Sequence, residues 1–483
     1  MCSRQSKTHR LGHRALRMMN IALTLSAARF ASAQGPGSPA APQRLGSPDV
    51  ALADAPTPPT ELLPEVGDPM LADPPDVARR IGSWAEALSF VRAQSPEYLG
   101  NLEVIHRAQA EARMALASLL PVVNGVGTYQ HNFNQTSIPL NGVVFVNPPT
   151  NAWTATATAT WTPINARAFL DHETSEKAVV VAKLSFEDKK RQIAAGVVSA
   201  MLATLSSSRV AELNRVGLRA ALERLQLTEA RLQYGQGTPL DVNRADEDVA
   251  ASRRLLLDGD ESLRRARESL GVALGSKEPV TVSTDLDLEG FERAVAATCR
   301  LNDEIERRPD VVAARGKVAL AKRAVVSAEL APLPTVGVAS AAGYTDSPLF
   351  TPNATFMVEG VLTVPLYDGG YRYGQLRDAR AAEVQAVQTL QATRIAAIVG
   401  SARAARSVEV SRADRDVSRA QRDLAAQVDV RTREAYARGR GTGLDLVISA
   451  QALRQAEINL AILEFQLAEA RADAVLENAE CAF

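Results

Sequence analysis

Two short stretches of the chain place glycine, threonine and aspartate at the same spacing. Residues Gly235–Asp241 read GQGTPLD and residues Gly439–Asp445 read GRGTGLD, so five of the seven positions match. Threonine followed three residues later by aspartate is typical of a helix capping box, in which both side chains accept backbone N–H groups. Pro239 also suits the first position of a helix. The first task that these residues can perform is therefore to begin a helix after a tight turn.

The same residues do not form a catalytic, cofactor or metal site. Gly235 and Gly237 do not follow a strand, so they are not a phosphate-binding loop. The histidines that follow the N-terminal region, His106, His131 and His172, have no partners at metal-ligand spacing. An exported hydrolase is therefore disfavoured, and we predict no enzymatic activity and no cofactor. The net charge of −1 gives no argument for a nucleic-acid partner.

Each stretch is followed by apolar residues that recur every seven positions. The second copy lies 204 residues after the first, the offset from Gly235 to Gly439. A heptad pattern held for five steps predicts coiled-coil packing. The positions between are mostly small, such as Ala245 and Ser252, so neighbouring helices can approach closely. The heptad residues are Val242, Val249, Leu256, Leu263 and Leu270, then Leu446, Leu453, Leu460, Leu467 and Ala474.

The segments upstream of the two stretches are also duplicated. Pro96 and Pro121 enclose one interval, and Pro309 and Pro334 enclose another of the same length. Because proline opens helices and disfavours helical backbone in the residue before it, each interval predicts a helix of about 24 residues. Two proline-free stretches then predict helices of about 70 residues, or about 100 Å each. These stretches are residues 164–234 and 371–438.

Between the shorter and the longer helix of each copy, the pattern changes to that of strands. Residues 153–161 read WTATATATW, so Trp153, Trp161 and the alanines share one face and the threonines share the other. At about 3.3 Å per residue and a tilt of about 40°, the two tryptophans are about 20 Å apart in height. This spacing suits a girdle at each edge of a membrane barrel, although a half-buried strand in a soluble sheet has the same pattern. The predicted strands are residues 122–134, 151–162, 335–345 and 354–364.

Four strands cannot close a barrel alone, and their open edges would need partners. The chain has no run of 18 apolar residues, so a membrane crossing would require a closed barrel. Three copies would supply twelve strands, a size that outer-membrane barrels have. Aligning Pro163 with Pro365 places the tryptophan face level with Glu359, which should avoid lipid. A bulge or a wrong register would explain this, so the face that meets lipid is left open.

The N-terminal region resembles an export signal followed by a linker. Basic residues, a short apolar run and Ala31-Ser32-Ala33 predict a signal peptide over residues 1–33. The Pro- and Ala-rich residues 34–78 predict a disordered leader. The two structural repeats then cover residues 79–290 and 291–480. Cys299 and Cys481 form either a disulfide or two unrelated thiols.

The ordered set of motifs resembles the TolC-like outer-membrane efflux protein family. The likeness covers nearly all of residues 79–480. It rests on the duplicated layout and on Trp84-Ala-Glu-Ala-Leu, Arg308-Pro309-Asp310, Pro365-Leu-Tyr-Asp-Gly-Gly370 and Tyr436-x-x-Gly439. The family implies a mainly α fold with a small β part. It also implies a homotrimer whose twelve-stranded barrel sits in outer-membrane lipid and continues as a long α-helical barrel through the periplasm.

The resemblance also implies functional positions. The chain would be the passive outer-membrane duct of a tripartite efflux or type I secretion system, joined to an inner-membrane pump through a periplasmic adaptor. Asp241 and Asp445 would each form a ring of three carboxylates at the periplasmic constriction, and Tyr436 matches the gate tyrosine of the family. Trp153 and Trp161 would be girdle residues. The residues expected to contact the adaptor are Gly235, Gly237, Thr238, Leu240, Gly439, Gly441, Thr442 and Leu444.

A periplasmic coiled-coil scaffold or spacer without a pore is the alternative. It explains the heptads and the Pro-rich leader, but it does not explain strand pairs at equivalent points of both repeats.

Overall fold

The fold was analysed in a computed structural model, in which the described residues belong to one structural unit. The expected signal peptide and the leader up to residue 65 lie outside the described residues. The described ranges are 66–75, 77–134, 136–140, 143–147, 150–301, 304–347, 350–481 and residue 483.

The same order of elements occurs twice along the chain. Each copy consists of a helix, two long strands, a long helix, a turn and a further helix, so the predicted duplication is confirmed. The helices of the first copy are α2 (Pro96–Ala117), α3 (Ala166–Gln233) and α4 (Pro239–Leu274). Those of the second copy are α6 (Pro309–Leu330), α7 (Tyr371–Ala437) and α8 (Gly443–Glu477).

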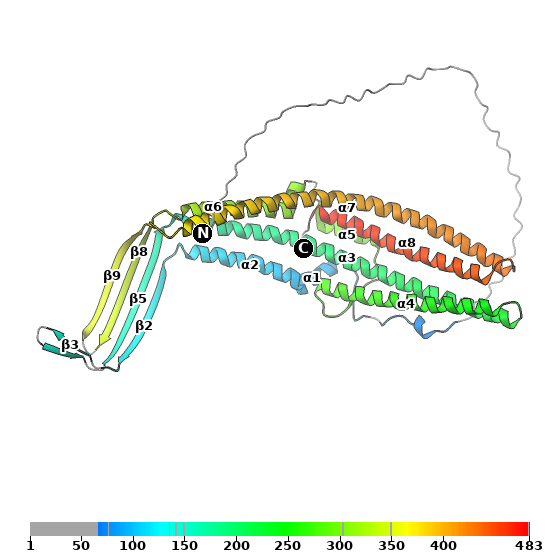
Figure 1. The fold of residues 1–483 in the computed structure, drawn as a ribbon, viewed down its shortest axis with the longest axis horizontal. Coiled ribbons are helices and arrows are strands. Elements are labelled where there is room, and N and C mark those ends of the chain that lie inside the picture. The colour runs from blue at the N-terminus through cyan, green and yellow to red at the C-terminus, as the bar shows by residue number, and fades with distance from the viewer. Residues whose placement is uncertain are drawn as a thin grey trace, which may run out of the picture. The chain divides into compact units, whose positions relative to one another are not determined.

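The helices form an open layer in the half of the molecule that contains the two turns. They lie side by side in the order α7, α8, α3 and α4 (Figure 1). The contacts that hold this layer together are those of α7 with α8, α8 with α3 and α3 with α4. Among the described helices, α4 and α7 are therefore the two edges of the layer.

The heptad residues of α4 are the ones that pack against α3. Val249, Leu256 and Leu263 are 1–3% exposed. Ala245 and Ser252 are buried beside them, and such small side chains leave room for α3 to approach closely. The apolar pattern of α4 therefore builds the α3–α4 pair, as the sequence predicts.

One window of α3 is long and apolar enough to span a membrane by its composition. This window is explained by packing, because Val197, Val198 and Met201 are at most 1% exposed inside the largest apolar cluster. A core helix passes the same composition test as a membrane span, so the window is weak evidence for a span.

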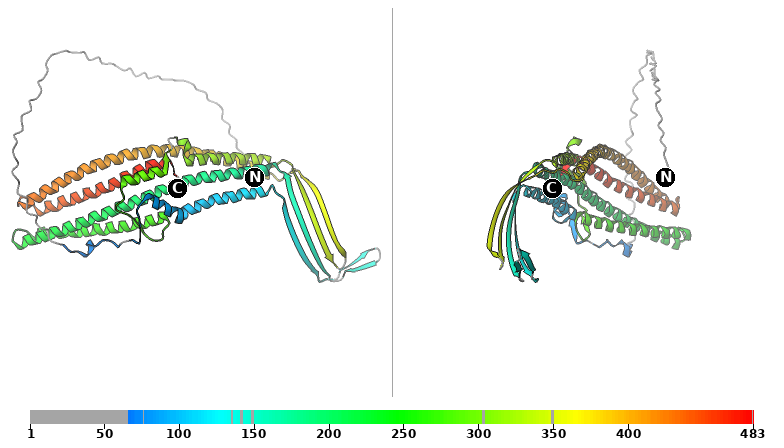
Figure 2. Two further views of the ribbon diagram at one scale, coloured as in Figure 1. Left: turned by 180° about the vertical axis from the view of Figure 1, so that it is seen from behind. Right: turned by 60° about the vertical axis from the view of Figure 1, so that its left-hand side comes forward.

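A four-stranded antiparallel sheet lies at the end of the helical layer opposite the turns (Figures 1 and 2). Its order is β2, β5, β8 and β9, so both copies contribute one strand pair and meet at β5 and β8. The strands are β2 (Val122–Asn132), β5 (Thr150–Ile164), β8 (Thr335–Ser347) and β9 (Phe350–Thr363).

The stretch between β2 and β5, outside the predicted strands, contains a hairpin. β3 (Thr136–Leu140) pairs antiparallel with β4 (Val143–Asn147). The residues of β4, VVFVN, are rich in β-branched and aromatic types, which favour strands. The asparagines and prolines of this stretch concealed that signal.

A bulge near the end of β5 resolves the conflict over the faces of the sheet. Trp161 pairs with Val338, but Ile164 pairs with Val336, so three steps on β5 oppose two on β8. The additional residue shifts side chains on one strand to the other face. An alignment anchored on Pro163 therefore has the wrong parity for the strand before it. In the observed register, Glu359 lies on the threonine face.

A small region between the sheet and the turns was not anticipated from the sequence. It contains two helices, two short strand pairs and the largest apolar cluster, which includes Trp84, Phe291 and Val295. Its elements are α1 (Trp84–Gln94), α5 (Leu288–Thr298), β1 (Arg79–Ile81) parallel to β6 (Val280–Val282), and β7 (Cys299–Leu301) antiparallel to β10 (Ala479–Cys481). Two short 3-10 helices are η1 (Pro69–Leu71) and η2 (Ile305–Arg307).

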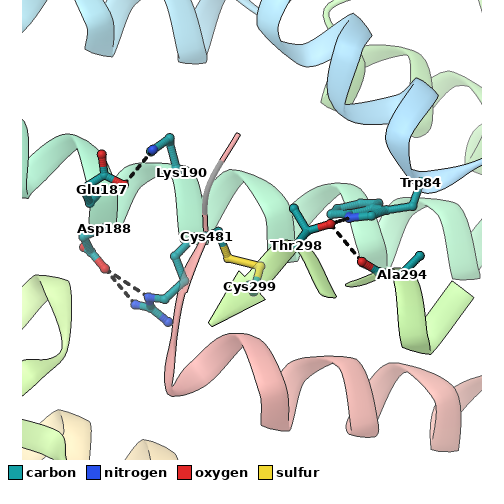
Figure 3. Close-up of a disulfide and its surroundings, with 9 residues drawn as sticks. Trp84, Glu187, Asp188, Lys190, Ala294, Thr298, Cys299 and Cys481 are labelled. Atoms are coloured by element: carbon teal, nitrogen blue, oxygen red, sulfur yellow. Dashed lines mark hydrogen bonds and ion pairs between the residues drawn. A yellow bond between two sulfur atoms is a disulfide. The ribbon is translucent and has the colours of Figure 1, made fainter. Parts of the chain in front are cut away.

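Cys299 and Cys481 form a disulfide between β7 and β10 (Figure 3). The alternative of two unrelated thiols is therefore wrong. Both cysteines are at most 2% exposed. Nearby, the Trp84 Nε1–H donates to Thr298 Oγ1 at 3.1 Å, which fixes α1 against α5 (Figure 3).

The expected disordered leader is wrong for residues 66–75, which lie along α3 and α4. Val66 and Met70 pack against an apolar cluster of these helices. The Arg253 guanidinium donates to Asp68 Oδ2 at 2.8 Å. The sequence prediction missed this contact because it was based on the proline content, which indicates an extended backbone. Proline content does not show where the few apolar side chains between the prolines will pack.

We predict that replacing Cys299 and Cys481 with serine lowers the melting temperature of the extracted protein. The disulfide closes a loop with a sequence separation of 182 residues. Its loss should cost about 2–5 kcal/mol, because the unfolded chain regains conformational freedom. Differential scanning fluorimetry of both proteins with and without reductant would measure the effect. Reductant should shift only the unsubstituted protein, and equal melting temperatures of the two oxidised proteins would contradict the prediction.

Candidate functional site

The α3–α4 turn and the α7–α8 turn lie at the same end of the helical layer (Figure 1). Each turn begins with a glycine in the left-handed region, Gly235 with φ 72° and Gly439 with φ 71°. The next glycines are also constrained, because a Cβ on Gly237 or Gly441 would approach backbone nitrogens at 3.1–3.2 Å. The glycines of both motifs are therefore required by the two turns.

The threonines of both motifs cap the helices that follow, as predicted. Thr442 Oγ1 accepts the Asp445 N–H at 3.2 Å, and Asp445 Oδ2 accepts the Thr442 N–H at 3.1 Å, which completes a capping box. Thr238 accepts the Asp241 N–H at 3.2 Å in the same way. The prediction of a helix start at each T-x-x-D is confirmed.

The two aspartates differ in their surroundings. Hydrogen bonds from the Thr442 hydroxyl, then from the Thr442 N–H, lower the pKa of Asp445. This carboxylate is held in the cap of its own helix. Asp241 Oδ2 likewise accepts the Thr238 hydroxyl at 2.7 Å, but Asp241 also lies beside the start of α8, where a Cβ on Gly443 would be 3.0 Å from its Oδ1. Arg244 is its ion-pair partner at 3.7 Å.

Tyr436 joins the two copies near the turns. The Arg231 guanidinium of α3 lies over the Tyr436 ring of α7, 4.1 Å from its centroid. Such a contact combines cation–π attraction with apolar packing. Leu240 and Leu444 are 55% and 39% exposed at the same end of the layer. The structure thus brings Asp241 and Tyr436 to the boundary between the copies, and it leaves two apolar side chains facing outward.

A buried polar cluster links both copies further along the helices, and the sequence reading missed it. The Arg224 Nη2–H donates to Asp248 Oδ2 at 2.5 Å, and the Gln451 Nε2–H donates to Asp248 Oδ1 at 2.9 Å. The Arg454 Nη1–H donates to Ser252 Oγ at 2.7 Å. Asp248 is 2% exposed. The sequence offers one sign of this cluster, because Asp248 directly precedes the heptad residue Val249 and a charge so close to a packed helix surface needs a partner.

The sheet has one mainly apolar face and one face of mixed polarity. Strand register places Trp153 between Tyr129 and Asp346, and Trp161 opposite Val338. Trp153 and Trp161 are 60% and 44% exposed. The face of the sheet that carries Trp153 and Trp161 is called the tryptophan face. Between the levels of these two residues, its positions hold apolar side chains or glycines, apart from Ser340. They are Val123, Gly125, Gly127, Ala155, Ala157, Ala159, Ala342, Tyr344, Ala354, Phe356 and Val358.

The opposite face contains the threonines of β5 and Glu359. In the register, Thr160 lies opposite Ala339, which lies opposite Glu359. Asn124 lies opposite Thr158 on the same face. Val126 and Met357 lie on this face too, so its polarity is mixed, but between the tryptophan levels the carboxylate and amide side chains of the four strands lie on this face alone. Each tryptophan has a contact of its own. The Trp153 ring packs against Tyr129 with 4.7 Å between centroids and 45° between ring planes, and the Trp161 Nε1–H donates to the Leu119 carbonyl at 2.9 Å.

Comparison with known proteins agrees with this architecture. The family model described as outer membrane efflux protein matches residues 102–276 and 301–474, one segment for each copy. The fusaric acid resistance protein FusA of Burkholderia cepacia is 26% identical over 318 residues, which are 62% of this chain and 58% of that protein. The pyoverdine export outer membrane protein OpmQ of Pseudomonas putida is 29% identical over 296 residues, 58% of each chain.

The fold also has solved relatives. The outer membrane channel CmeC of Campylobacter jejuni superposes with a TM-score of 0.70 at 15% sequence identity, over 87% of this chain and 95% of that chain. The matched region spans 58% of the length of the two curated relatives. Since the family model covers both copies of the repeat, the chain belongs to the outer membrane efflux protein family.

Proposed function

We propose that three copies of this chain form a passive export duct in the outer membrane of a Gram-negative bacterium, extending into the periplasm. The observation that carries the proposal is the sheet. It has one mainly apolar face between two tryptophan levels, and within the described residues its edge strands β2 and β9 each pair with only one neighbouring strand. Four strands from each of three chains would close a twelve-stranded barrel without open edges.

The two faces of the sheet set its orientation in this barrel. The tryptophan face would meet lipid, because nearly all of its positions between Trp153 and Trp161 are apolar. The threonine face would line the lumen, where Glu359 stays in water. The exposed aromatic side chains at both tryptophan levels suit the two membrane interfaces.

At the other end, the turns would form the gate. In a trimer, Asp241 and Asp445 become two rings of three carboxylates where the helices end, and such rings favour cations. The contact of Tyr436 with Arg231 supports a role for Tyr436 in holding the two repeats of one chain together at the turns. Leu240 and Leu444, with the glycine turns around them, would contact the adaptor.

The proposed duct does no chemistry and takes its energy from an inner-membrane pump through the periplasmic adaptor. The curated relatives are named for fusaric acid resistance and for pyoverdine export. These names support a small organic cargo in preference to a protein. A scaffold without a pore remains the rival function, and the apolar sheet face is the observation against it.

Electron microscopy of detergent-extracted protein tests the proposal. A threefold particle with a tapered stalk of about 100 Å, the length of about 70 helical residues, is the expected result. A monomer, or a rod that stays soluble without detergent, would exclude the barrel and favour the scaffold.

The neighbouring residues Ala157 and Thr158 provide a matched test of the two faces. We predict that Ala157→Arg prevents assembly in the membrane, because an arginine near the middle of the lipid face costs about 2–4 kcal/mol. Thr158→Arg should assemble as the unsubstituted protein does, because water surrounds that position. Heat-resistant trimer on gels of outer-membrane fractions is the readout, and the reverse pattern would invert the assignment of the faces.

We further predict that Asp241→Asn and Asp445→Asn reduce the preference of the channel for cations and raise its conductance. Both changes remove a ring of charge without changing side-chain size. Planar-bilayer recordings in a salt gradient measure both quantities. Asp285→Asn, a change at an exposed aspartate in the loop between β6 and α5, is the control. If the Asp241→Asn and Asp445→Asn channels have the conductance and ion preference of the Asp285→Asn control and of the unsubstituted protein, these rings do not form the gate.

A further inference from the structure

A pocket lies within one chain in the half of the helices nearer the sheet. There the helices contact one another in the order α2, α3, α6 and α7 (Figure 1). All four helices line this pocket, which has a volume of about 600 Å³, in the range of small-molecule sites. Its charged and amide side chains are Glu111 of α2, Arg167 and Asp171 of α3, and Gln375 and Asp378 of α7.

The order of the four helices shows on which side of the layer the pocket lies. α2 and α7 are the two ends of the row, with α3 and α6 between them. Side chains from both ends can reach a common pocket only on the side toward which the row curves. In a closed barrel of helices, that side is the lumen. The pocket itself needs one chain only, whereas its place in a lumen rests on the proposed function.

Part of the pocket wall is apolar. Ligand sites commonly combine such a wall with a few polar groups that fix the orientation of the ligand. The wall therefore suits the hydrocarbon or aromatic part of a ligand, and the polar groups decide which charge the ligand carries. The apolar residues are Ala178 of α3, Leu320, Ala321, Ala324 and Ala328 of α6, and Ala379 of α7.

Three carboxylates and one guanidinium line the pocket, so its charge is negative. Arg167 Nε lies 3.6 Å from Asp171 Oδ2, and these two charges balance each other. The Arg107 Nε–H donates to Glu111 Oε1 at 3.0 Å along α2. Asp378 has no hydrogen-bond or ion-pair partner among the described residues. The pocket thus contains one carboxylate whose charge no neighbour balances.

A second unpaired acceptor lies three residues before Asp378 on the same helix. The Gln375 Nε2–H donates to the Tyr371 hydroxyl at 3.0 Å, while Gln375 Oε1 is buried without a donor among the described residues. Buried carbonyl oxygens nearly always have a donor. Because residues three apart share one face of a helix, Asp378 and Gln375 offer a charged and a neutral acceptor on the same side of α7.

We propose that this pocket binds an organic ammonium ion with an apolar part. An ammonium group has several N–H donors, so it can donate to Asp378 and to Gln375 together. The apolar part of the ion would lie on the alanines of α6. A metal ion fits less well, because the described residues contain no group of side chains that could hold one. An anion would meet the unbalanced charge of Asp378 and is disfavoured.

Binding of dansylcadaverine tests the proposal. This probe carries a primary ammonium group and an apolar fluorophore, whose emission rises and shifts to shorter wavelength when it leaves water. The protein would be titrated in lipid nanodiscs, with empty nanodiscs as the blank. N-acetyl-dansylcadaverine has the same fluorophore and no positive charge, so it should bind at least about tenfold more weakly. Equal affinity for the two probes would overturn the assignment of an ammonium site.

A matched pair of variants locates the charge that binds the probe. Asp378→Asn should weaken binding of dansylcadaverine at least about tenfold, because it removes the unbalanced carboxylate and keeps the side-chain size. Asp423→Asn is the control, since Asp423 is an exposed aspartate of the same helix outside the pocket. If Asp378→Asn binds the probe as tightly as the control does, the pocket is not the binding site.

A second pair of variants tests the apolar wall without changing any charge. Ala324→Phe should fill the pocket and weaken binding of dansylcadaverine, whereas Ala319→Phe should not. Both alanines are exposed on α6, so both variants should fold, and only Ala324 lines the pocket. Equal affinities of these two variants would overturn the proposed position of the ligand.

Planar-bilayer recordings separate the pocket from the duct. Dansylcadaverine should reduce the current of the unsubstituted channel, and Asp378→Asn should relieve this block. A threefold channel that does not bind the probe overturns the pocket and leaves the proposed duct in place. Binding by a protein that forms no channel, or binding without block, supports the pocket and overturns its place in a lumen.

Discussion

Backbone hydrogen bonding in lipid is the constraint on which the rest of this structure depends. A strand edge that faces lipid leaves its N–H and C=O groups without partners, at a cost of several kcal/mol for each group. One chain supplies the sheet β2-β5-β8-β9, whose two outer strands have only one neighbour each. The same incompleteness appears in the helical layer, whose edges are α4 and α7. In the proposed trimer, further copies would close both the sheet and the helical layer.

Because the chain contains the same unit twice, one kind of helix contact can serve both within a chain and between chains of the proposed trimer. Two similar units within the chain already contain one helix contact of the kind that closure needs, and symmetry requires only that the contact be repeated between chains. Small residues along α4, such as Ala245 and Ser252, keep the helix pairs close and the wall thin. At the contact of α8 with α3, the absence of a side chain at Gly217 of α3 lets Arg454 of α8 lie across the helix.

Much of the fold could be predicted from the sequence because its strongest determinants are periodic. Heptads and paired prolines placed the six repeat helices, and the T-x-x-D motifs placed the starts of α4 and α8. What the sequence did not reveal depends on contacts without a period. Comparing the two repeats made a bulge one of two explanations for the conflict of faces, but only the strand pairing shows that it lies before Ile164. The packing of Met70 on α3 and α4, and the buried Asp248 between the two copies, likewise depend on residues far apart in the chain.

The disulfide has a consequence for the order in which the protein is made. Cys299 precedes α6 and Cys481 follows α8, so the bond encloses the whole second copy of the repeat in one covalent ring. During export, Cys299 emerges first and has no partner until the complete second copy has followed it. In an exported chain, this pair can therefore be oxidised only after α6 to α8 have been translocated, and a chain truncated before Cys481 keeps Cys299 as a free thiol.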